Sequence, residues 1–432
     1  MTENKLFLQF FAGADNNAGY NVNTTGGLMQ NGEVTDSNSL APEIKTFYDK
    51  TLIHLAGPKL VHDQFGQRKP IPANGGKTIE FRKFSKLPKA LKPITEGVTP
   101  VGNKLHVTAV TAAVDQYGDY IEQTDMLEMT AIDNTVVEAT KELADQAGIT
   151  LDTIVRNEIV GGTNVYYCPA VTDGTEMEVR SREDINADCR LRVNDIFRMA
   201  ASLRANNAPK IGDSYVAIIH PFVAYDLMQD AGEQWVGIQK YANPENILKG
   251  ELGKLGGVRF VESSEAKIFG PSVIADGYSR LTVSASAAKG ATTVKVEEVL
   301  TANAAANIEV YVGGEKNTVT KIEAGNDYST LTLASALGAA VDAGAVVCGT
   351  GAGKDGSAVF CTLVLGENAY GVSGIEGGGL EHIVKQRGYG NDPLNQRSAV
   401  GWKATKCAKR LVEEYIVRCE SGSDFSATAE NN

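Results

Sequence analysis

The sequence predicts an α+β protein with a small all-β domain inserted in its body. Three observations lead to this class: one long helical pattern, two long strand patterns with no helix between them, and a change of composition near residue 277. Elsewhere, helical stretches alternate with short apolar strands, which is typical of a compact mixed body. The chain has 432 residues, enough for two or three domains.

The N-terminal residues 1–40 are predicted to form an arm. Residues 12–39 are rich in Asn and Gly and cannot bury enough surface to fold alone. The tip of the arm is apolar, which favours an arm that lies on the surface of a partner. Phe7, Phe10 and Phe11 are therefore candidate subunit-interface residues. The segment 41–65 follows, with a helix over 41–56 that has Pro42 in its first turn.

Residues 66–121 are predicted to form an extended β-ribbon. Strand patterns at 78–84 and 105–121 flank a loop that contains three prolines. Because an isolated hairpin is marginal in water, we expect the ribbon to rest on a neighbouring subunit. The alternative is an ordinary hairpin of the core sheet. The ribbon is strongly basic, and its candidate interface residues are Arg82, Lys83, Lys86, Lys89 and Lys92.

One long helix is predicted over residues 126–160, and the rest of the chain is organised around it. Asp125 and Glu128 offer a capping box with Asp125 as the cap, and Gly161 and Gly162 can end the helix. The pattern leaves two interpretations open: a core helix with a solvated acidic face, or a spine that supports an extended protein. Apolar residues recur at helical spacing on one face: Met129, Ile132, Val136, Ala139, Leu143, Ala147, Leu151 and Ile154.

The remaining chain is predicted to form a mixed α/β body and an insertion. Residues 277–354 are rich in Ala, Thr, Val and Gly, with short β patterns only, and form the predicted all-β insertion. Buried strands at 258–261 and 359–365 flank this insertion and are expected in one sheet, so its two ends should lie close together. Residues 421–432 are expected to be a frayed tail.

Composition excludes several classes of function. A net charge of -12 argues against a protein that grips nucleic acid. Six scattered cysteines without zinc-ligand spacing indicate free thiols in a reducing compartment. No apolar run approaches the ~20 residues that cross a membrane, and the N-terminal sequence does not resemble a signal peptide.

No catalytic, cofactor or metal site is predicted. His54 and His62 are separated by a Gly-Pro break, which disfavours a metal site. The one phosphate-loop candidate, residues 349–356, has Cys348 and Asp355 where a Walker loop needs Gly and Ser or Thr. No nucleophile elbow or zinc-protease motif occurs, so we expect a protein that is not an enzyme.

Several motifs together resemble the major capsid proteins of tailed phages, in the branch typified by coliphage N-four. The resemblance covers residues 40–270 and 357–420. Its motifs are Phe65-Gly66, Ile71-Pro72, residues 75–82, residues 95–100, Gln116-Tyr117-Gly118, Thr124-Asp125, residues 258–262 and residues 388–402.

This resemblance implies the Hong Kong 97-type fold. Such a fold has an N-terminal arm, an extended loop, a peripheral domain with a long spine helix and an axial domain. In this chain the resemblance implies a peripheral domain of residues 122–180 and 366–420 and an axial domain of residues 181–276 and 355–365. It also implies hexameric and pentameric capsomers of this chain, which enclose double-stranded DNA without reading its sequence. The further partners implied are scaffolding, portal and decoration proteins, and the location is the virion, assembled in the cytoplasm of a host bacterium.

Two other functions remain open from the residues alone. The runner-up is a surface or adhesion protein that binds carbohydrate through the inserted β-domain, a function that would need an export signal. A hydrolase with an unrecognised site has only the mixed α/β body in its favour.

Overall fold

The computed structural model describes residues 29–30, 33–34, 61–91, 93, 96–97, 99, 102–131, 135–172, 174–239, 251–376, 379–385, 394 and 396–432. The chain divides into two units, Met1–Ala56 and Gly57–Asn432. In the first unit the described residues are the antiparallel strands β1 (Met29–Gln30) and β2 (Glu33–Val34). The candidates Phe7, Phe10 and Phe11, the predicted helix at 41–56, and Lys92 lie outside the described residues.

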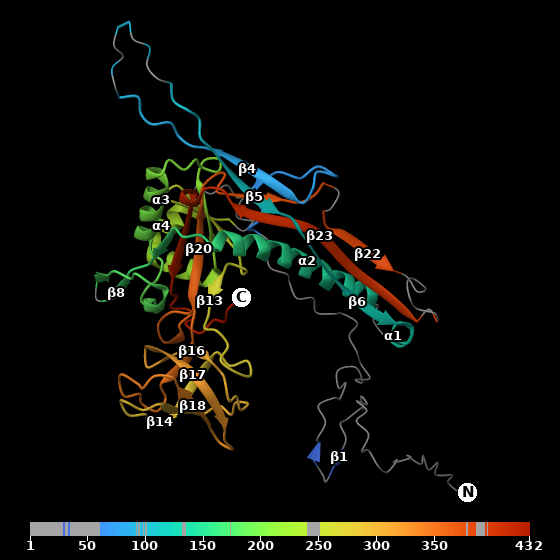
Figure 1. Cartoon of the computed structure of the whole chain (residues 1–432), viewed down its shortest axis with the longest axis vertical. Helices are drawn as coiled ribbons and strands as arrows, with labels where there is room; N and C mark the ends of the chain where they lie inside the picture. The colour runs from blue at the N-terminus through green and yellow to red at the C-terminus, as the bar shows by residue number, and fades with distance from the viewer. Residues whose placement is uncertain are drawn as a thin grey trace. The chain divides into compact units, whose positions relative to one another are not determined.

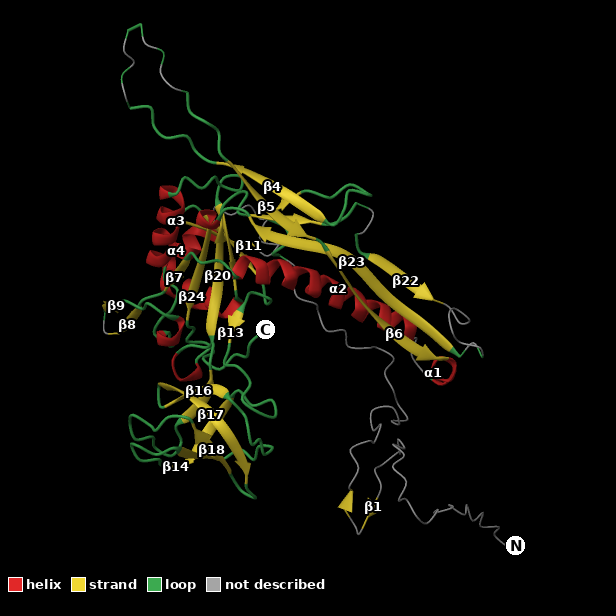
Figure 2. Ribbon diagram, viewed as in Figure 1, coloured by secondary structure: helices red, strands yellow, loops and turns green. Residues whose placement is uncertain are grey.

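The second unit contains a seven-stranded mixed sheet, the body sheet, in the order β11-β12-β10-β20-β24-β7, with β13 paired to β20 (Figure 2). Strands β10 and β20 are buried along their whole length because both faces of the sheet are covered. Their bounds are β7 Val165–Tyr167, β10 Tyr215–Ile219, β11 Glu251–Leu255, β12 Val258–Glu262, β13 Ile268–Phe269, β20 Val359–Leu365 and β24 Ile416–Ser421.

Alternation along β10 sends its side chains to two different cores. Ala217 and Ile219 pack with α3 (Val193–Ala205) and α4 (Pro221–Gln239). On the opposite face, Val216 and Ile218 pack with Val155 and Ile159 near the end of α2 (Thr135–Val160). The α2 helix therefore covers the second face of the body sheet with its C-terminal end.

The rest of α2 packs on a second, five-stranded sheet, in the order β22-β23-β21-β3 with β6 also paired to β23. Leu143 and Ala147 of α2 contact Val400, Trp402 and Ala404 of β23. Figure 1 shows α2 running along β23 and β6. The bounds are β3 Gln67–Arg68, β6 Asp115–Thr124, β21 Tyr370–Ser373, β22 Glu381–Lys385 and β23 Arg397–Arg410.

Polar contacts tie the helix to the same strands. The Trp402 indole Nε1 donates to Gln146 Oε1 at 3.1 Å, and Gln146 Nε2 donates to Asp119 Oδ2 at 2.7 Å. These bonds from Gln146 and from the Tyr120 N–H hold the pKa of Asp119 below its usual value. One helix therefore connects both sheets, as expected of a spine.

The prediction of a single helix over 126–160 is wrong in one respect. A short helix α1 (Asp125–Thr130) ends at Ala131, whose ψ of 137° is extended, and α2 begins at Thr135. The cap of α1 is Thr124 and not Asp125, because Thr124 Oγ1 accepts from the Leu127 N–H at 3.4 Å. Met126, Leu127 and Met129 of α1 are exposed, whereas α2 buries one face with Ala139, Leu143 and Ala147, so no shared core keeps the two segments in one helix.

The predicted strand at 105–121 is also two strands. Residues of β5 (Val107–Ala113) pair with β4 (Thr78–Phe84), whereas β6 pairs with β23. Val114, between them, is 6% exposed and packs against Phe81 and Cys407. The chain therefore changes partner at Val114, where a buried side chain fixes the position of the ribbon on the second sheet.

A six-stranded closed barrel, in the order β14-β15-β18-β17-β16-β19, is inserted in the sequence between β13 and β20 of the body sheet. Its entrance and exit are adjacent, because Ile268 and Phe269 of β13 pair with Phe360 and Val359 of β20. The expectation that the flanking strands share one sheet is confirmed. The bounds are β14 Arg280–Ala285, β15 Thr293–Val296, β16 Ile308–Val312, β17 Glu315–Ala324, β18 Ser329–Leu333 and β19 Val346–Gly349.

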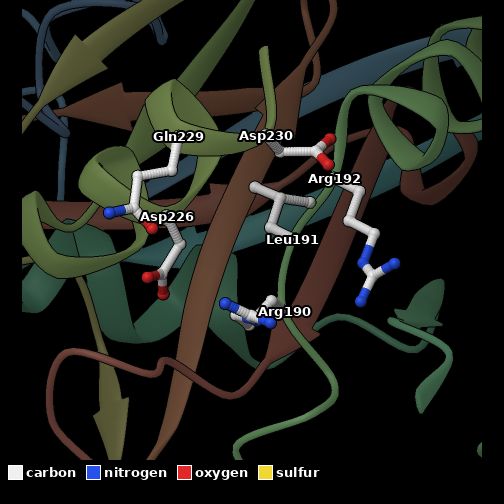
Figure 3. Close-up of a pocket in the computed structure, with 6 residues that line it drawn as sticks. All are labelled: Arg190, Leu191, Arg192, Asp226, Gln229 and Asp230. Atoms are coloured by element: carbon white, nitrogen blue, oxygen red, sulfur yellow. The ribbon is translucent and has the colours of Figure 1, made fainter. Parts of the chain in front are cut away.

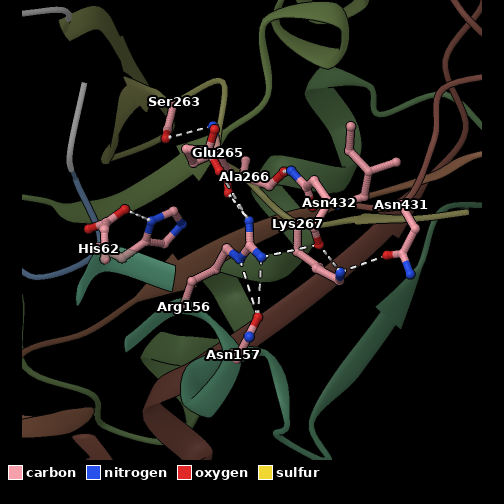
Figure 4. Close-up of polar contacts among 11 residues, drawn as sticks. His62, Arg156, Asn157, Ser263, Glu265, Ala266, Lys267, Asn431 and Asn432 are labelled. Atoms are coloured by element: carbon pink, nitrogen blue, oxygen red, sulfur yellow. Dashed lines mark hydrogen bonds and ion pairs between the residues drawn. The ribbon is translucent and has the colours of Figure 1, made fainter. Parts of the chain in front are cut away.

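The expectation that residues 421–432 form a frayed tail is also wrong, because the last residues pack on the body (Figure 4). Asn432 Oδ1 accepts from the Ile268 N–H at 3.0 Å, and its Nδ2 donates to the Ala266 carbonyl at 3.0 Å. The buried Arg156 donates through Nη2 to the Asn432 carbonyl at 3.2 Å and through Nη1 to the Glu265 carbonyl at 2.8 Å. Polar contacts of this kind leave no apolar periodicity in a sequence, which is why the pattern did not predict them.

Short elements complete the described chain. A hairpin precedes α3, and three 3₁₀ turns connect larger elements. Their bounds are β8 Ala170–Thr172, β9 Thr175–Met177, and the 3₁₀ turns Arg182–Asp184, Lys354–Gly356 and Glu413–Tyr415.

Candidate assembly surfaces

The ribbon, here β4 and β5 with their connecting segment, is anchored at one end and free at the other. Phe81 is 4% exposed and lies directly over Gly371 of β21. A Cβ at Gly371 would lie 2.7 Å from Cζ of the Phe81 ring, so glycine is required for this contact. Beyond Phe84 the connecting segment extends past the paired strands (Figure 1). The ribbon is thus fixed at its base, and the described residues of its connecting segment are exposed in this single chain.

Four of the five predicted basic residues lie in the described part of the chain, and all four are exposed. Two of them have acidic partners within the chain. Arg82 Nε donates to Glu80 Oε1 at 3.0 Å, and Lys83 Nζ lies 3.7 Å from Glu414 Oε2. Lys86 and Lys89 are exposed and have no ion pair within the described part of the chain. Exposed pairs contribute only ~0.2–1 kcal/mol each. The structure therefore leaves Lys86 and Lys89 as the strongest cationic candidates for contact with another molecule.

Sequence reasoning missed the apolar side chains of this same segment. Leu91 is 82% exposed, Leu105 68% and Phe84 62%, and Leu87 and Val107 are also exposed. The prolines between them break any period of two or 3.6 residues, so no regular pattern marks them in the sequence. A group of large exposed apolar residues is typical of an interaction surface.

Further exposed apolar side chains lie at the far end of the second sheet: Tyr120, Met126, Met129, Val384 and Leu394. They do not form one face, because Tyr120 and Val384 pair with Gly401 and Val400, two successive residues of β23, and therefore point to opposite sides of the sheet. They come from β6, α1, β22 and the segment that precedes β23. A hydrogen bond joins α1 to that segment, because the Asp125 N–H donates to the Gln396 carbonyl at 2.9 Å. Met129, which the sequence analysis placed on the apolar face of the long helix, is here on the outside.

A small hollow beside α4 gives no sign of a reactive centre (Figure 3). Its lining combines arginines and aspartates: Arg190, Leu191, Arg192, Asp226, Gln229 and Asp230. Asp230 Oδ2 accepts from the Val193 N–H at 2.8 Å, and Asp226 Oδ2 accepts from the Asp424 N–H at 3.2 Å. Burial raises the pKa of Asp226. The two carboxylates therefore hold the start of α3 and the segment after β24 against α4.

Throughout the described ranges, no group of three or more His, Cys, Asp or Glu side chains is placed to hold a metal ion. His62 Nδ1 instead forms a hydrogen bond with Asp152 Oδ2 at 2.7 Å, and both side chains are buried. Among the helices that the structure describes, none is long and apolar enough to cross a bilayer.

Comparison with known proteins gives no match by sequence but a full-length match by structure. No protein-family model matches the chain, and no curated protein matches it. The capsid structure of cyanophage P-SCSP1u superimposes with a TM-score of 0.53 at 12% identity, covering 94% of this chain and 100% of the other.

Two further capsid structures agree. The capsid of Ralstonia phage GP4 gives a TM-score of 0.53 at 12% identity, over 91% of this chain and 98% of the other. The capsid of cyanophage Pam1 gives 0.52 at 13% identity, over 92% and 100%. This chain therefore has the fold of phage capsid proteins over nearly its whole length.

Proposed function

We propose that this chain is the major capsid protein of a tailed bacteriophage and assembles into the icosahedral shell around double-stranded DNA. The observation that carries the proposal is the match to phage capsid chains, which spans 94% of this chain and the whole of one neighbour. We assign the chain to the Hong Kong 97-type fold and, from its motifs, to the branch typified by coliphage N-four. The predicted role is structural and not enzymatic.

The parts of that fold map onto the described elements. The second sheet with α2 corresponds to the peripheral domain, and the body sheet with α3 and α4 to the axial domain. The ribbon corresponds to the extended loop, and residues 1–40 to the arm. The barrel, within residues 277–354, is an insertion in the axial domain.

Assembly then proceeds by interlocking of copies into hexamers and pentamers. Burying a large apolar side chain contributes about 1.5–3 kcal/mol, more than an exposed ion pair at ~0.2–1 kcal/mol. The exposed apolar residues of the ribbon therefore supply most of the contact energy with a neighbour, and Lys86 and Lys89 steer its approach. Association costs roughly 4–15 kcal/mol in lost freedom, so several such contacts must form together.

The acidic balance of the chain suits a wall around DNA. A net charge of -12 keeps packaged duplex from adhering to the inner surface. We place the barrel on the outer face of the shell, where it meets no DNA. Scaffolding, portal and decoration proteins are the further partners in this proposal, and the virion is its location.

The mass of the purified chain tests the proposal. Light scattering of the protein expressed in bacteria should give megadalton particles, and electron microscopy should show closed shells with hexameric and pentameric units. A stable monomer or dimer at all concentrations and ionic strengths, or shapeless aggregates, would contradict it.

A further inference from the structure

Two buried cysteines lie side by side in the body sheet. Cys419 is in β24, and Cys168 directly follows β7, the parallel neighbour of β24. Their Sγ atoms are 3.4 Å apart, and both side chains are 0% exposed. The Cys168 N–H donates to the Glu420 carbonyl at 3.0 Å, which extends the pairing of the two strands to the cysteines. The sulfur contact is thus held by the backbone of two paired strands.

The other four cysteines lack this arrangement. All six cysteines are free and buried, and all lie in the described part of the chain. Within that part, the pair Cys168 and Cys419 is the one thiol–thiol contact at hydrogen-bond distance. A disulfide needs an S–S distance of about 2.05 Å, so the two sulfur atoms need to approach by a little over ~1 Å. Cys419 pairs with Tyr166, so Cys168 lies diagonally across from it, and the bond needs a shift of the segment that follows β7 in addition to rotation of the two side chains.

We propose that Cys168 and Cys419 form a site of oxidative modification, at which a peroxide converts the two thiols into an intramolecular disulfide. One thiol, as its thiolate, attacks the peroxide oxygen and becomes a sulfenic acid while hydroxide leaves. The second sulfur then attacks the sulfenic sulfur, and the S–O bond breaks to form the S–S bond. With hydrogen peroxide the balance is two thiols and one peroxide to one disulfide and two waters.

Burial determines when this reaction takes place. Desolvation, with the neighbouring Cys419 thiol, raises the pKa of Cys168 well above its usual value. For Cys419, the largest single influence is a hydrogen bond from Cys168, which lowers the pKa, but burial together with the neighbouring Asp195, Cys361 and Glu420 raises the pKa overall. Because the thiolate is the nucleophile, both groups react slowly. A reducing compartment therefore keeps the pair as thiols, and prolonged exposure to oxidant outside it closes the bond.

The bond would join segments 251 positions apart in the sequence. It would link β7, an outer strand of the body sheet, to β24, the last strand of the chain. A crosslink that closes so long a loop restricts the unfolded chain and stabilises the folded one. The modification therefore secures the edge of the body sheet after the barrel and both sheets have formed.

Thiol counting and peptide mapping test the proposal on the full-length chain. The protein is treated with hydrogen peroxide, the excess is removed with catalase, and the free thiols are alkylated after unfolding. The count should fall from six to four per chain, and one linked peptide pair should contain Cys168 and Cys419. Reduction should restore the count to six, and non-reducing electrophoresis should show a more compact denatured chain.

Variants separate this pair from the other thiols. Cys168→Ala and Cys419→Ala should each abolish the linked peptides. The control Cys361→Ala, at another buried thiol of the body sheet, should retain the link, with its count falling from five to three. If an alanine variant fails to fold, the peptide map of the unaltered chain still decides. Six alkylated thiols after peroxide, a link between other cysteines, or oxidation to sulfinic acid without a link would overturn the proposal.

Discussion

The barrel and the ribbon are both built from antiparallel strands, but their apolar side chains have different surroundings. In the barrel, β14 pairs with β19 and closes the sheet, so that Val310 and Leu331 are 0% exposed. The ribbon has two strands and no closure, and Val107 on β5 is 50% exposed. The barrel buries its core within one chain, whereas the ribbon leaves apolar side chains uncovered. Closure of the sheet, and not strand sequence, separates the module that buries its own apolar residues from the one that leaves them exposed.

The largest effect is expected from charges placed on the ribbon. Changing Phe84, Leu87 and Leu91 to Asp should abolish particle formation, because each added carboxylate would have to be buried in the interface. Folding of the single chain should be nearly unchanged, since all three side chains are exposed. Light scattering and electron microscopy report assembly, and circular dichroism reports folding.

A matched control places the same three charges on the barrel. Tyr278, Val299 and Val346 are also exposed, so their change to Asp adds the same charge. Particles should still form from this control. Normal particles from the ribbon variant would show that the ribbon is not an interface.

Next in size is the loss of a barrel core side chain. Leu331→Ala should destabilise the barrel by about 2–5 kcal/mol through lost burial and a residual cavity. Hydrogen exchange of barrel amides should accelerate accordingly, while unfolding followed by Trp402 fluorescence on the second sheet should keep its midpoint. Val299→Ala, at an exposed site of the barrel, is the control and should change neither the hydrogen-exchange rate of the barrel amides nor the unfolding midpoint. A shift of both probes together would mean that the barrel does not fold as a unit of its own.

A pH effect should distinguish the body from the barrel, which contains no histidine. His220 is 6% exposed, and burial lowers its pKa to about 4. The unfolded chain binds this proton near pH 6.5, so it holds more protons than the folded chain between about pH 4 and 6.5. The free energy of unfolding should therefore fall as the pH drops through this window, by at most ~3 kcal/mol from this group.

The variant His220→Asn isolates that contribution. His220 Nδ1 accepts from the Phe222 N–H at 3.2 Å at the start of α4, and an asparagine oxygen can serve as the same cap. Urea unfolding between pH 6.5 and 4 should lose less stability in the variant, while carboxylates contribute equally to both proteins. Equal pH dependence in both would refute the assignment.

A smaller and salt-dependent effect is expected from the ribbon lysines. Lys86→Glu with Lys89→Glu should slow or reduce assembly at low ionic strength. The difference should narrow near 1 M salt, where the screening length is ~3 Å. Lys289→Glu with Lys354→Glu, the same charge change at exposed residues within 277–354, is the control. If the ribbon variant assembles at the same rate as the unaltered chain at every salt concentration, Lys86 and Lys89 do not steer the approach of a neighbour.

The smallest effect on the shell should come from removing the barrel altogether. Replacing residues 278–354 by a short Gly-Ser linker joins two strands, β13 and β20, that already pair. The linker therefore costs little loop entropy, and shells should form without their outer protrusions. A chain that no longer folds, or density for the barrel on the inner wall, would contradict this placement.

The sequence by itself determined the features that repeat at a fixed spacing. Strands at 78–84 and 359–365 appear with the predicted bounds. The helix α2 likewise follows from the spacing of Ala139, Leu143 and Ala147. In each case a continuous core on one face imposes the period, so that the pattern and the structure have one cause. The exposed lysines of the ribbon were also found, because charged side chains are rarely buried.

Only the tertiary structure decided where those patterns end and which apolar residues stay outside. The helical period runs through Ala131 although the helix does not, because α1 and α2 do not share a core. Leu91 and Leu331 are the same residue type, yet one is 82% exposed and the other 0%. Burial depends on strands far apart in the sequence, such as β14 and β19, that close over one leucine and leave the other uncovered. The contact of Cys168 with Cys419 likewise follows from the pairing of β7 with β24, which no local spacing encodes.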